Sequence, residues 1–309
     1  MTTRYGYLGP AGTFCQMALD DWAPAKGQEH VPCDSVVAAL EALRAGTLDA
    51  AMVPIENSVE GGVSATLDAL SVGSDVVITG EVLVPVTFVL AARPGTRLAD
   101  VRAVGTHPHG WAQVRTWMNA NLPSAAYLTT LSTAAAAADL DPTVGTVAAY
   151  QAAVCAPVAA RIHGLDVLAE DIGDNGRAVT RFALVARPGQ TPARTGADKT
   201  TLVLYQRDDH PGGLLELLEQ FAARGVNMTR LESRPTGEAM GSYCFSIDIE
   251  GHIADARVAE TLMGLRRVCA QVRYLGSYAR ADGRPTTPVV GMSDHDFADA
   301  RRWLDDLRG

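Results

Sequence analysis

The chain has 309 residues, which suggests about two domains, and its 47% hydrophobic and 20% charged residues are typical of a folded globular protein rather than a disordered or collagen-like one. The formal net charge of −9 argues against a nucleic-acid-binding surface, and no polybasic segment for anionic lipid is present. The longest apolar run, residues 82–92, is shorter than the roughly 20 residues that a membrane span needs.

The N-terminal residues run directly into a strand pattern, without the charged segment and apolar core of a secretory signal. The five cysteines are widely spaced, odd in number and without a CxxC pair, which is typical of reduced thiols. We therefore expect a cytoplasmic protein without structural zinc.

Predicted strands and helices alternate over the first 186 residues. The strands are expected at residues 5–8, 30–33, 49–55, 76–91, 101–105, 126–130, 144–147 and 182–186. The helices are expected at residues 12–22, from a cap at Asp34 and Ser35 to Gly46, and at 108–121, 133–139 and 148–156. This alternation predicts α/β layers with mostly buried sheets.

A Pro- and Gly-rich segment, residues 187–198, predicts a linker between domains. After it, strands are expected at residues 200–206, 228–233, 243–249 and 271–278, and helices at 213–224 and 258–265. The order βαββαβ is that of a ferredoxin-like domain. Apolar residues alternate with Cys244, Ser246 and Asp248, which predicts one buried face for that strand. Residues 281–292 form a tail, and Ser293 or Asp294 is expected to cap a final helix.

Two strand–turn–helix junctions carry candidate ligand contacts. In residues 7–14, glycines allow the backbone to approach a ligand and the helix start offers N–H groups to an anion, although an ordinary turn would look the same. In residues 53–63, Glu56, Asn57 and Ser58 follow a buried strand. Polar groups at the carboxyl end of such a strand are where open α/β sheets bind ligands, and a capped loop is the alternative.

Further candidates follow in the order of the chain. His107 and His109 flank Pro108 without a nearby acid or cysteine, so we do not expect a metal there, and Gln113 could point into a cleft. Ser132 and Thr133 begin a helix, as caps or as part of an anion site. Thr180 and Arg181 stand where a turn enters an apolar strand. That arginine could bind a carboxylate, or be a solvated strand residue.

Five motifs in this order resemble the prephenate dehydratase family over about residues 4–280. They are GPAGTF (9–14), VPIENSVEGG (53–62), THPHGWAQ (106–113), TRF (180–182) and ESRP (232–235). The resemblance implies a catalytic region of two α/β lobes, like a type 2 periplasmic binding protein, with the site in the cleft. It also implies a C-terminal ACT regulatory domain. We expect the catalytic domain at residues 1–188, a linker at 189–199, the ACT domain at 200–280, and a tail with a short helix at 281–309.

The resemblance also implies roles for individual residues. Its essential threonine falls on Thr180, and we expect catalysis to involve Thr180, Asn57, Gln113 and Glu56. Substrate is expected to be bound by Thr13, Ser58, Thr106, His107, Ser132, Thr133, Arg181 and Phe182. Phenylalanine is the expected effector, bound by Pro211, Gly212, Gly213, Leu214, Leu215, Asn227, Glu232, Ser233, Arg234 and Pro235.

The implied reaction is the decarboxylating dehydration of prephenate to phenylpyruvate, without cofactor or metal. Thr180 is our hypothesis for the proton donor, with His107 as the alternative and Glu56 in an orienting role. An arogenate dehydratase and a non-catalytic amino-acid sensor remain alternatives. A homodimer or homotetramer through the ACT domains is expected.

The sequence departs from the family at three places. His109 stands where the family more often has Gln, and Ala178 stands where it often has Asn. Gly213 replaces the Ala of the regulatory Gly-Ala-Leu motif.

Overall fold

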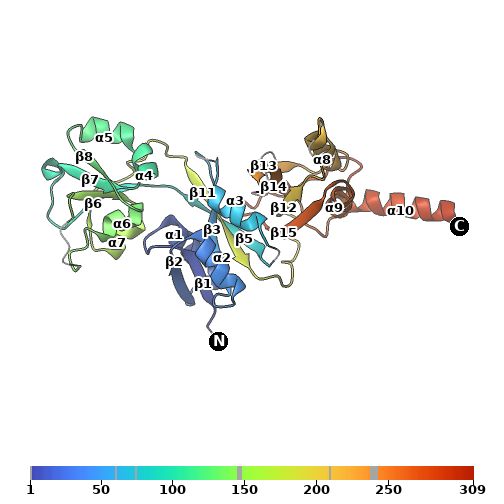
Figure 1. Ribbon diagram of the computed structural model, residues 1–309, viewed down its shortest axis with the longest axis horizontal. Coiled ribbons are helices and arrows are strands. Elements are labelled where there is room, and N and C mark those ends of the chain that lie inside the picture. Colours follow the sequence, from blue (N-terminus) through green and yellow to red (C-terminus); the bar gives the residue numbers. More distant parts are fainter. Residues whose placement is uncertain (1, 60, 74, 145–147, 209, 237–242) are drawn as a thin grey trace. The chain divides into compact units, whose positions relative to one another are not determined.

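The computed structural model describes residues 2–59, 61–73, 75–144, 148–208, 210–236 and 243–309 (Figure 1). Part of one sequence prediction, the strand at 144–147, lies outside these ranges. The chain forms two compact units. Unit 1 comprises Met1–Gly61 and Val82–Phe182, and unit 2 comprises Gly62–Glu81 and Ala183–Gly309.

The first sheet has the strand order β2-β1-β3-β11-β5. Its parallel part consists of β1 (Arg4–Leu8), β2 (Glu29–Cys33) and β3 (Ala50–Asn57), and the short β4 (Gly61–Gly62) pairs with β3. Two helices, α1 (Phe14–Asp21) and α2 (Val36–Arg44), begin at side-chain caps on Thr13 and Ser35. Strands β5 (Val77–Pro85) and β11 (Val179–Ala186) are each divided between the two units.

The second sheet lies entirely in unit 1 and has the order β10-β6-β9-β7-β8. Its strands are β6 (Val89–Ala92), β7 (Ala103–Thr106), β8 (Ala126–Thr129), β9 (Ala152–Cys155) and β10 (Asp166–Ala169). Helices α4 (Pro108–Ala112), α5 (Arg115–Asn121), α6 (Thr133–Ala138) and α7 (Pro157–Ile162) accompany them. Unit 1 also contains two short 3-10 helices, η1 (Ala23–Ala25) and η2 (Leu98–Asp100). The two α/β lobes expected from the sequence are therefore present.

Several predicted elements of this region are wrong in detail. Within the helix predicted at residues 148–156, residues 152–155 instead form strand β9. These four residues are fully buried in the middle of a sheet, and this burial overrides the helix propensity of alanine. The helix starts only at Pro157, which occupies its first turn. The single strand predicted at 76–91 is two strands in different sheets, and the helix at 108–121 breaks at Gln113 and Val114. Strand β10 was not predicted.

The third sheet, in unit 2, has the antiparallel order β13-β14-β12-β15. It is built from β12 (Asp198–Tyr205), β13 (Met228–Pro235), β14 (Tyr243–Glu250) and β15 (Gln271–Ala279), with α8 (Gly213–Ala222) and α9 (Ala256–Val268). The predicted βαββαβ order is confirmed. Leu217 and Phe221 of α8 and Leu265 of α9 pack against the apolar side chains of the sheet.

Strand β14 differs from the prediction because both of its faces are buried. Asp248 is completely inaccessible, although it belongs to the polar face. Its carboxylate accepts hydrogen bonds from the Arg230 guanidinium at 2.9 and 3.1 Å and from Thr201 Oγ1 at 2.7 Å. A charged group can be buried when it is paired and hydrogen-bonded in this way.

Unit 2 also contains the segment Gly62–Glu81, which holds α3 (Ser64–Ser71) and the first half of β5. Polar contacts join this segment to the third sheet. The Arg234 guanidinium donates to both Asp68 carboxylate oxygens at 2.8 and 2.9 Å, and Lys199 Nζ lies 2.8 Å from the buried Glu81 carboxylate. Arg273 and Tyr205 both donate to the Ser71 carbonyl oxygen.

Helix α10 (Asp294–Arg308) follows, and the predicted Ser293 cap is confirmed as a capping box with Asp296. The helix continues outward beyond α9, and none of its residues is buried (Figure 1). Among the described residues, no helix is both long enough and apolar enough to cross a membrane.

Candidate active site

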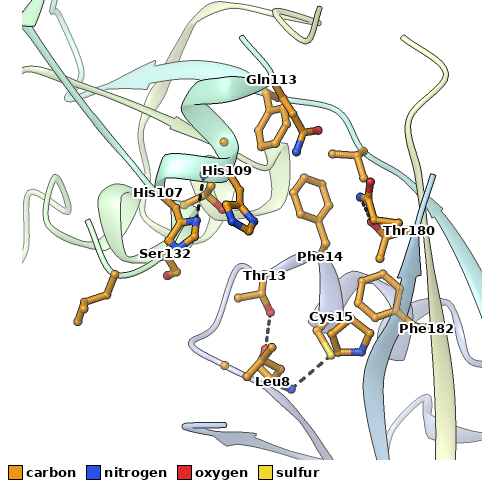
Figure 2. Close-up of a pocket in the computed structure, with 18 residues that line it drawn as sticks. Leu8, Thr13, Phe14, Cys15, His107, His109, Gln113, Ser132, Thr180 and Phe182 are labelled. Carbon is orange, nitrogen blue, oxygen red and sulfur yellow. Dashed lines mark hydrogen bonds between the residues drawn. The ribbon is translucent and has the colours of Figure 1, made fainter. Parts of the chain in front are cut away.

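A cavity of about 290 Å³ in unit 1 collects most of the predicted site residues (Figure 2). Residues from both α/β lobes line it, and many of them stand at strand ends or helix starts. The lining residues are Leu8, Gly9, Thr13, Phe14, Cys15, Pro54, Asn57, Val86, Phe88, His107, His109, Gly110, Gln113, Leu131, Ser132, Thr133, Thr180 and Phe182. Its size and its mixture of apolar walls with a few polar groups are those of a small-molecule site.

Thr180 and Asn57 form the polar contact on one side of this pocket. Thr180 lies near the start of β11 and Asn57 at the end of β3, so two strands bring them together. Asn57 Oδ1 accepts from the backbone N–H of Val59 at 2.8 Å, which turns Nδ2 toward Thr180 Oγ1, also at 2.8 Å. Because the amide donates to the threonine oxygen, the hydroxyl proton of Thr180 is left to donate elsewhere.

The first strand–helix junction contributes Thr13 and Cys15. Thr13 Oγ1 donates to the Leu8 carbonyl oxygen at 2.9 Å and accepts from Gln16 N at the start of α1. Cys15 Sγ donates to Met52 O at 3.0 Å. Burial raises the pKa of the Cys15 thiol to about 12, so this sulfur is neutral near pH 7. The junction thus presents neutral groups to the pocket.

Helices α4 and α6 border the pocket on the side of the second lobe. His107 is the N-cap of α4, and its Nδ1 accepts from the backbone N–H of His109 at 3.3 Å. Ser132 caps α6 by accepting from Ala135 N at 2.9 Å. In Figure 2 the imidazoles and Ser132 lie on one side, with Thr180 and Phe182 on the other. Gln113, the C-cap of α4, also lines the cavity.

Aromatic side chains give the pocket an apolar middle. Phe14 from α1 and Phe88 before β6 meet edge to face, with ring centroids 5.6 Å apart. Phe182, on β11, is buried and lines the cavity as well. Together with Val86 and Pro54 they form the apolar walls of the cavity.

Four predicted site residues do not line the cavity. Arg181 is buried next to Thr180, and its Nε lies 3.6 Å from Glu56 Oε2. Ser58 exchanges hydrogen bonds with the backbone of Val179, its Oγ accepting at 3.0 Å and its N–H donating at 2.9 Å. Thr106 is fully buried and donates to Val154 O at 2.8 Å. The contacts of Ser58 and Thr106 hold strands together near the pocket.

Sequence reasoning left out several lining residues, notably Phe14, Phe88, Val86, Cys15 and His109 as a binding group. The aromatic residues gave no signal because a single Phe in an apolar stretch looks like an ordinary core residue. His109 was considered as a metal ligand and as a departure from the Gln that the family more often has, but it was not predicted to bind substrate. Among the described residues, no group of three His, Cys, Asp or Glu side chains could hold a metal ion.

The predicted effector residues occupy two places in unit 2. Pro211 to Leu215 surround the start of α8, where Gly212 has a φ of +90°, a conformation that favours glycine. Glu232 to Pro235 form the end of β13, and Asn227 directly precedes that strand. A cavity of about 180 Å³ lies beside the α8 start, and of these residues only Gly213 lines it.

The comparisons with known proteins give a consistent result. The sequence profile of the family described as prephenate dehydratase matches residues 5–190, and that of the ACT domain matches residues 200–267. The chain is 44% identical to a prephenate dehydratase of Amycolatopsis methanolica, over 98% of this chain and 97% of the relative. It is also 44% identical to one of Mycobacterium tuberculosis H37Rv, over 99% of this chain and 94% of the relative.

A solved structure is similar over the whole chain. It is a crystal structure of prephenate dehydratase from Arthrobacter aurescens in complex with L-Phe, with 54% sequence identity and a TM-score of 0.94. The match covers 99% of this chain and all of that one.

Proposed function

The chain belongs to the prephenate dehydratase family, a family of hydro-lyases, and on this basis we propose how its pocket converts prephenate to phenylpyruvate. The substrate is a dianion with a ring carboxylate, a ring hydroxyl and a pyruvyl side chain. Loss of CO₂ supplies an electron pair to the ring, the C–O bond breaks, and the departing hydroxide takes up a proton to become water. One proton is consumed, and the product retains only the side-chain carboxylate.

The observation that carries the proposal is the hydrogen bond between Asn57 and Thr180. The amide holds the Thr180 oxygen as an acceptor, so its proton is available to the leaving hydroxyl, and polarisation by the amide strengthens that donation. A threonine hydroxyl is a weak acid, so transfer must accompany C–O cleavage. Thr180 as proton donor is our assignment, with His107 as the alternative.

Apolar walls support the decarboxylation step. A carboxylate held among Phe14, Phe88 and Phe182 is poorly solvated, and it loses its charge when it leaves as CO₂. An apolar setting therefore favours the transition state over the charged ground state. In this arrangement Gln113 supplies a further hydrogen bond to the substrate, and the Glu56–Arg181 pair orients the neighbouring strand ends.

The lining also bears on the choice between prephenate and arogenate. Arogenate carries an ammonium group where prephenate has a keto group, and an ammonium group is usually recognised by a carboxylate. Among the described residues that line the cavity, none carries a carboxylate. This composition supports prephenate as the preferred substrate, which kcat/KM measured on both compounds would decide.

We further propose regulation by phenylalanine at paired ACT domains, because the similar structure from Arthrobacter aurescens contains L-Phe. The effector would contact residues around Pro211–Leu215 and Glu232–Pro235. The protein would form a homodimer or homotetramer through its ACT domains, residues 200–280. Arg234 of the second set is bonded to Asp68 on α3, which follows Asn57 by eleven residues along the chain. This link gives the effector a route to the pocket.

The proposal also covers the domain boundaries and the cellular location of the protein. We propose residues 1–188 as the catalytic domain, with the linker at 189–199 and the ACT domain at 200–280. All five cysteines are free thiols, which supports a reducing, cytoplasmic location.

The test is direct. Purified protein is incubated with prephenate, and phenylpyruvate is followed by its absorbance in alkali, with and without L-Phe. Turnover is expected without added cofactor. An absence of phenylpyruvate, together with retained phenylalanine binding, would favour the non-catalytic sensor instead.

A further inference from the structure

The pocket must hold a dianion with very little cationic side chain. Among the described residues that line it, only His107 and His109 can acquire a positive charge. The nearby Arg181 does not line the cavity and lies beside the Glu56 carboxylate. Any full positive charge that meets the substrate in this lining must therefore come from an imidazole.

The two imidazoles are not equivalent. His107 Nδ1 accepts from the His109 backbone N–H, so that nitrogen carries a lone pair, and protonating it would remove the cap of α4. The two rings lie edge to face with centroids 5.0 Å apart, a separation at which two imidazolium charges repel each other. The cap of α4 uses the His107 ring, so His109 is the imidazole that can carry a charge without loss of this cap.

The chemistry of the reaction decides which carboxylate this charge should meet. A cation on the ring carboxylate would stabilise a charge that disappears as CO₂ forms, and would slow the reaction. A cation on the side-chain carboxylate meets a group that survives into the product. We infer that His109, as an imidazolium, binds the side-chain carboxylate that the reaction retains. This inference rests on the proposed function.

The other ionisable groups around the pocket leave this role to His109. The Cys15 thiol is neutral. Glu56 and Arg181 form a pair of zero net charge on the neighbouring strands, and the α6 start contributes Ser132 and Thr133, which carry no ionisable side chain. Gly110, the next residue of α4, packs closely against the pocket wall, because a Cβ there would come within 2.9 Å of Thr106 Oγ1 and of Thr133 Cγ2.

The consequence is proton-linked substrate binding. Histidine is the side chain that changes charge between about pH 5 and 8, so prephenate should bind less tightly as His109 loses its proton. Glutamine, which the family more often has at this position, can donate a hydrogen bond but carries no charge. A His109→Gln variant therefore separates the charge from the hydrogen bond.

The experiment compares wild type and His109→Gln from pH 5.5 to 9. For wild type, kcat/KM should fall by about tenfold in total above the ionisation and then level off near the value of the neutral variant, because one bound proton is lost. His109→Gln should be about tenfold weaker at pH 6, the usual advantage of a charged over a neutral hydrogen bond. The kcat/KM of His109→Gln should not fall as the pH rises, and its kcat should stay within threefold of the wild-type value. His109→Lys should move the fall to higher pH.

Product inhibition identifies the carboxylate. Phenylpyruvate has only the retained one, so its inhibition constant should show the same pH dependence in wild type and lose it in His109→Gln. His295→Gln, on the exposed helix α10, is the matched control and should behave as wild type.

The outcomes separate the two proposals. If wild type does not convert prephenate, the proposed function fails. If wild type converts prephenate while His109→Gln keeps the full pH dependence, this inference is overturned and the function stands. A variant that binds prephenate weakly but phenylpyruvate normally would also overturn it, because His109 would then face the carboxylate that is lost.

Discussion

Asn57 donates a hydrogen bond to the Thr180 hydroxyl oxygen, so Thr180 is the acceptor in this pair. The backbone N–H of Val59 can only donate, so it selects the amide oxygen and turns the amide nitrogen to the threonine. A single main-chain hydrogen bond thereby makes the Thr180 oxygen an acceptor from Asn57 and leaves its proton to donate to another group.

The first prediction concerns Thr180 itself. Thr180→Ala should lower kcat by ~10²–10⁴-fold, the usual contribution of a general acid, whereas Thr180→Ser should retain more activity because it keeps the hydroxyl. Steady-state assays with prephenate measure both. Thr129→Ala, on strand β8, is the matched control, and an unchanged circular dichroism spectrum would show that the fold survives. Wild-type turnover by Thr180→Ala would remove Thr180 from the mechanism.

The second prediction concerns Cys15, which lines the pocket but should be inert. Burial holds its pKa at about 12, so at pH 8 only about one thiol in ten thousand is ionised, and only the thiolate reacts. Because a raised pKa disfavours the charged form, reactivity should increase only as the pH rises toward 12. Iodoacetamide labelling and peptide mass spectrometry should find the more exposed Cys33 modified first. Faster labelling of Cys15 would contradict this.

The sequence indicated most of the polar residues that line the cavity, but it did not indicate the aromatic residues that form its walls. Thr180, Asn57 and His107 stand in motifs at strand ends and a helix start, and Gln113 ends helix α4 in the same motif as His107, so sequence spacing is informative for all four. The phenylalanines do not, because they come together only through packing of segments that are distant in the chain. Arg181 was expected to meet substrate, but the sequence could not reveal that Glu56 would lie beside it.

At the scale of elements, the link between β13 and α3 is where regulation is expected to pass. Asp68→Asn removes the charge that holds the Arg234 fork, while Asp68 lies outside the pocket. We expect the L-Phe concentration for half-maximal inhibition to rise at least fivefold, in the range of typical coupling energies of about 1–3 kcal/mol. Activity without L-Phe should remain close to wild type.

The measurement is an inhibition curve with L-Phe at fixed prephenate. Asp305→Asn, on the exposed helix α10, removes a carboxylate without touching this link and should respond as wild type. Equal inhibition of Asp68→Asn and wild type would show that the signal travels elsewhere.

The elements differ in how far their sequences specify them. The βαββαβ unit was predictable because its strands alternate cleanly and its helices have one apolar face. Strand β9 was not, since four small residues give no periodicity and only the sheet around them makes them a strand. The burial of both faces of β14 also depended on a distant partner, Arg230, that pairs with Asp248.

At the scale of the whole molecule, unit 2 is assembled from two separate stretches of chain. Residues 62–81 are bonded to the third sheet through Asp68, Ser71 and Glu81, and the Glu81–Lys199 pair is buried. Breaking a buried pair by removing one partner costs about 3–5 kcal/mol, so these contacts should keep the stretches together.

Cleavage of the linker tests this assembly. With a specific protease site introduced after Gly189, the two fragments should co-elute in size-exclusion chromatography, because residues 62–81 stay on one fragment and the third sheet on the other. They should separate in denaturing urea. Lys199→Met, which removes the ammonium group next to Glu81, should weaken the association. Separate elution of the fragments under native conditions would contradict it.

The buried Glu81 carboxylate lies on one stretch of chain and its partner Lys199 on another, and this has a consequence for protein engineering. A regulatory module cut at the linker and transplanted onto another enzyme would arrive with Lys199, Arg234 and Arg273 stripped of their counterparts, and the donor would be left with an acidic strand facing water. A chimera that is meant to inherit the response to phenylalanine should therefore carry residues 62–81 along with residues 199–280, so that Lys199 keeps its partner Glu81.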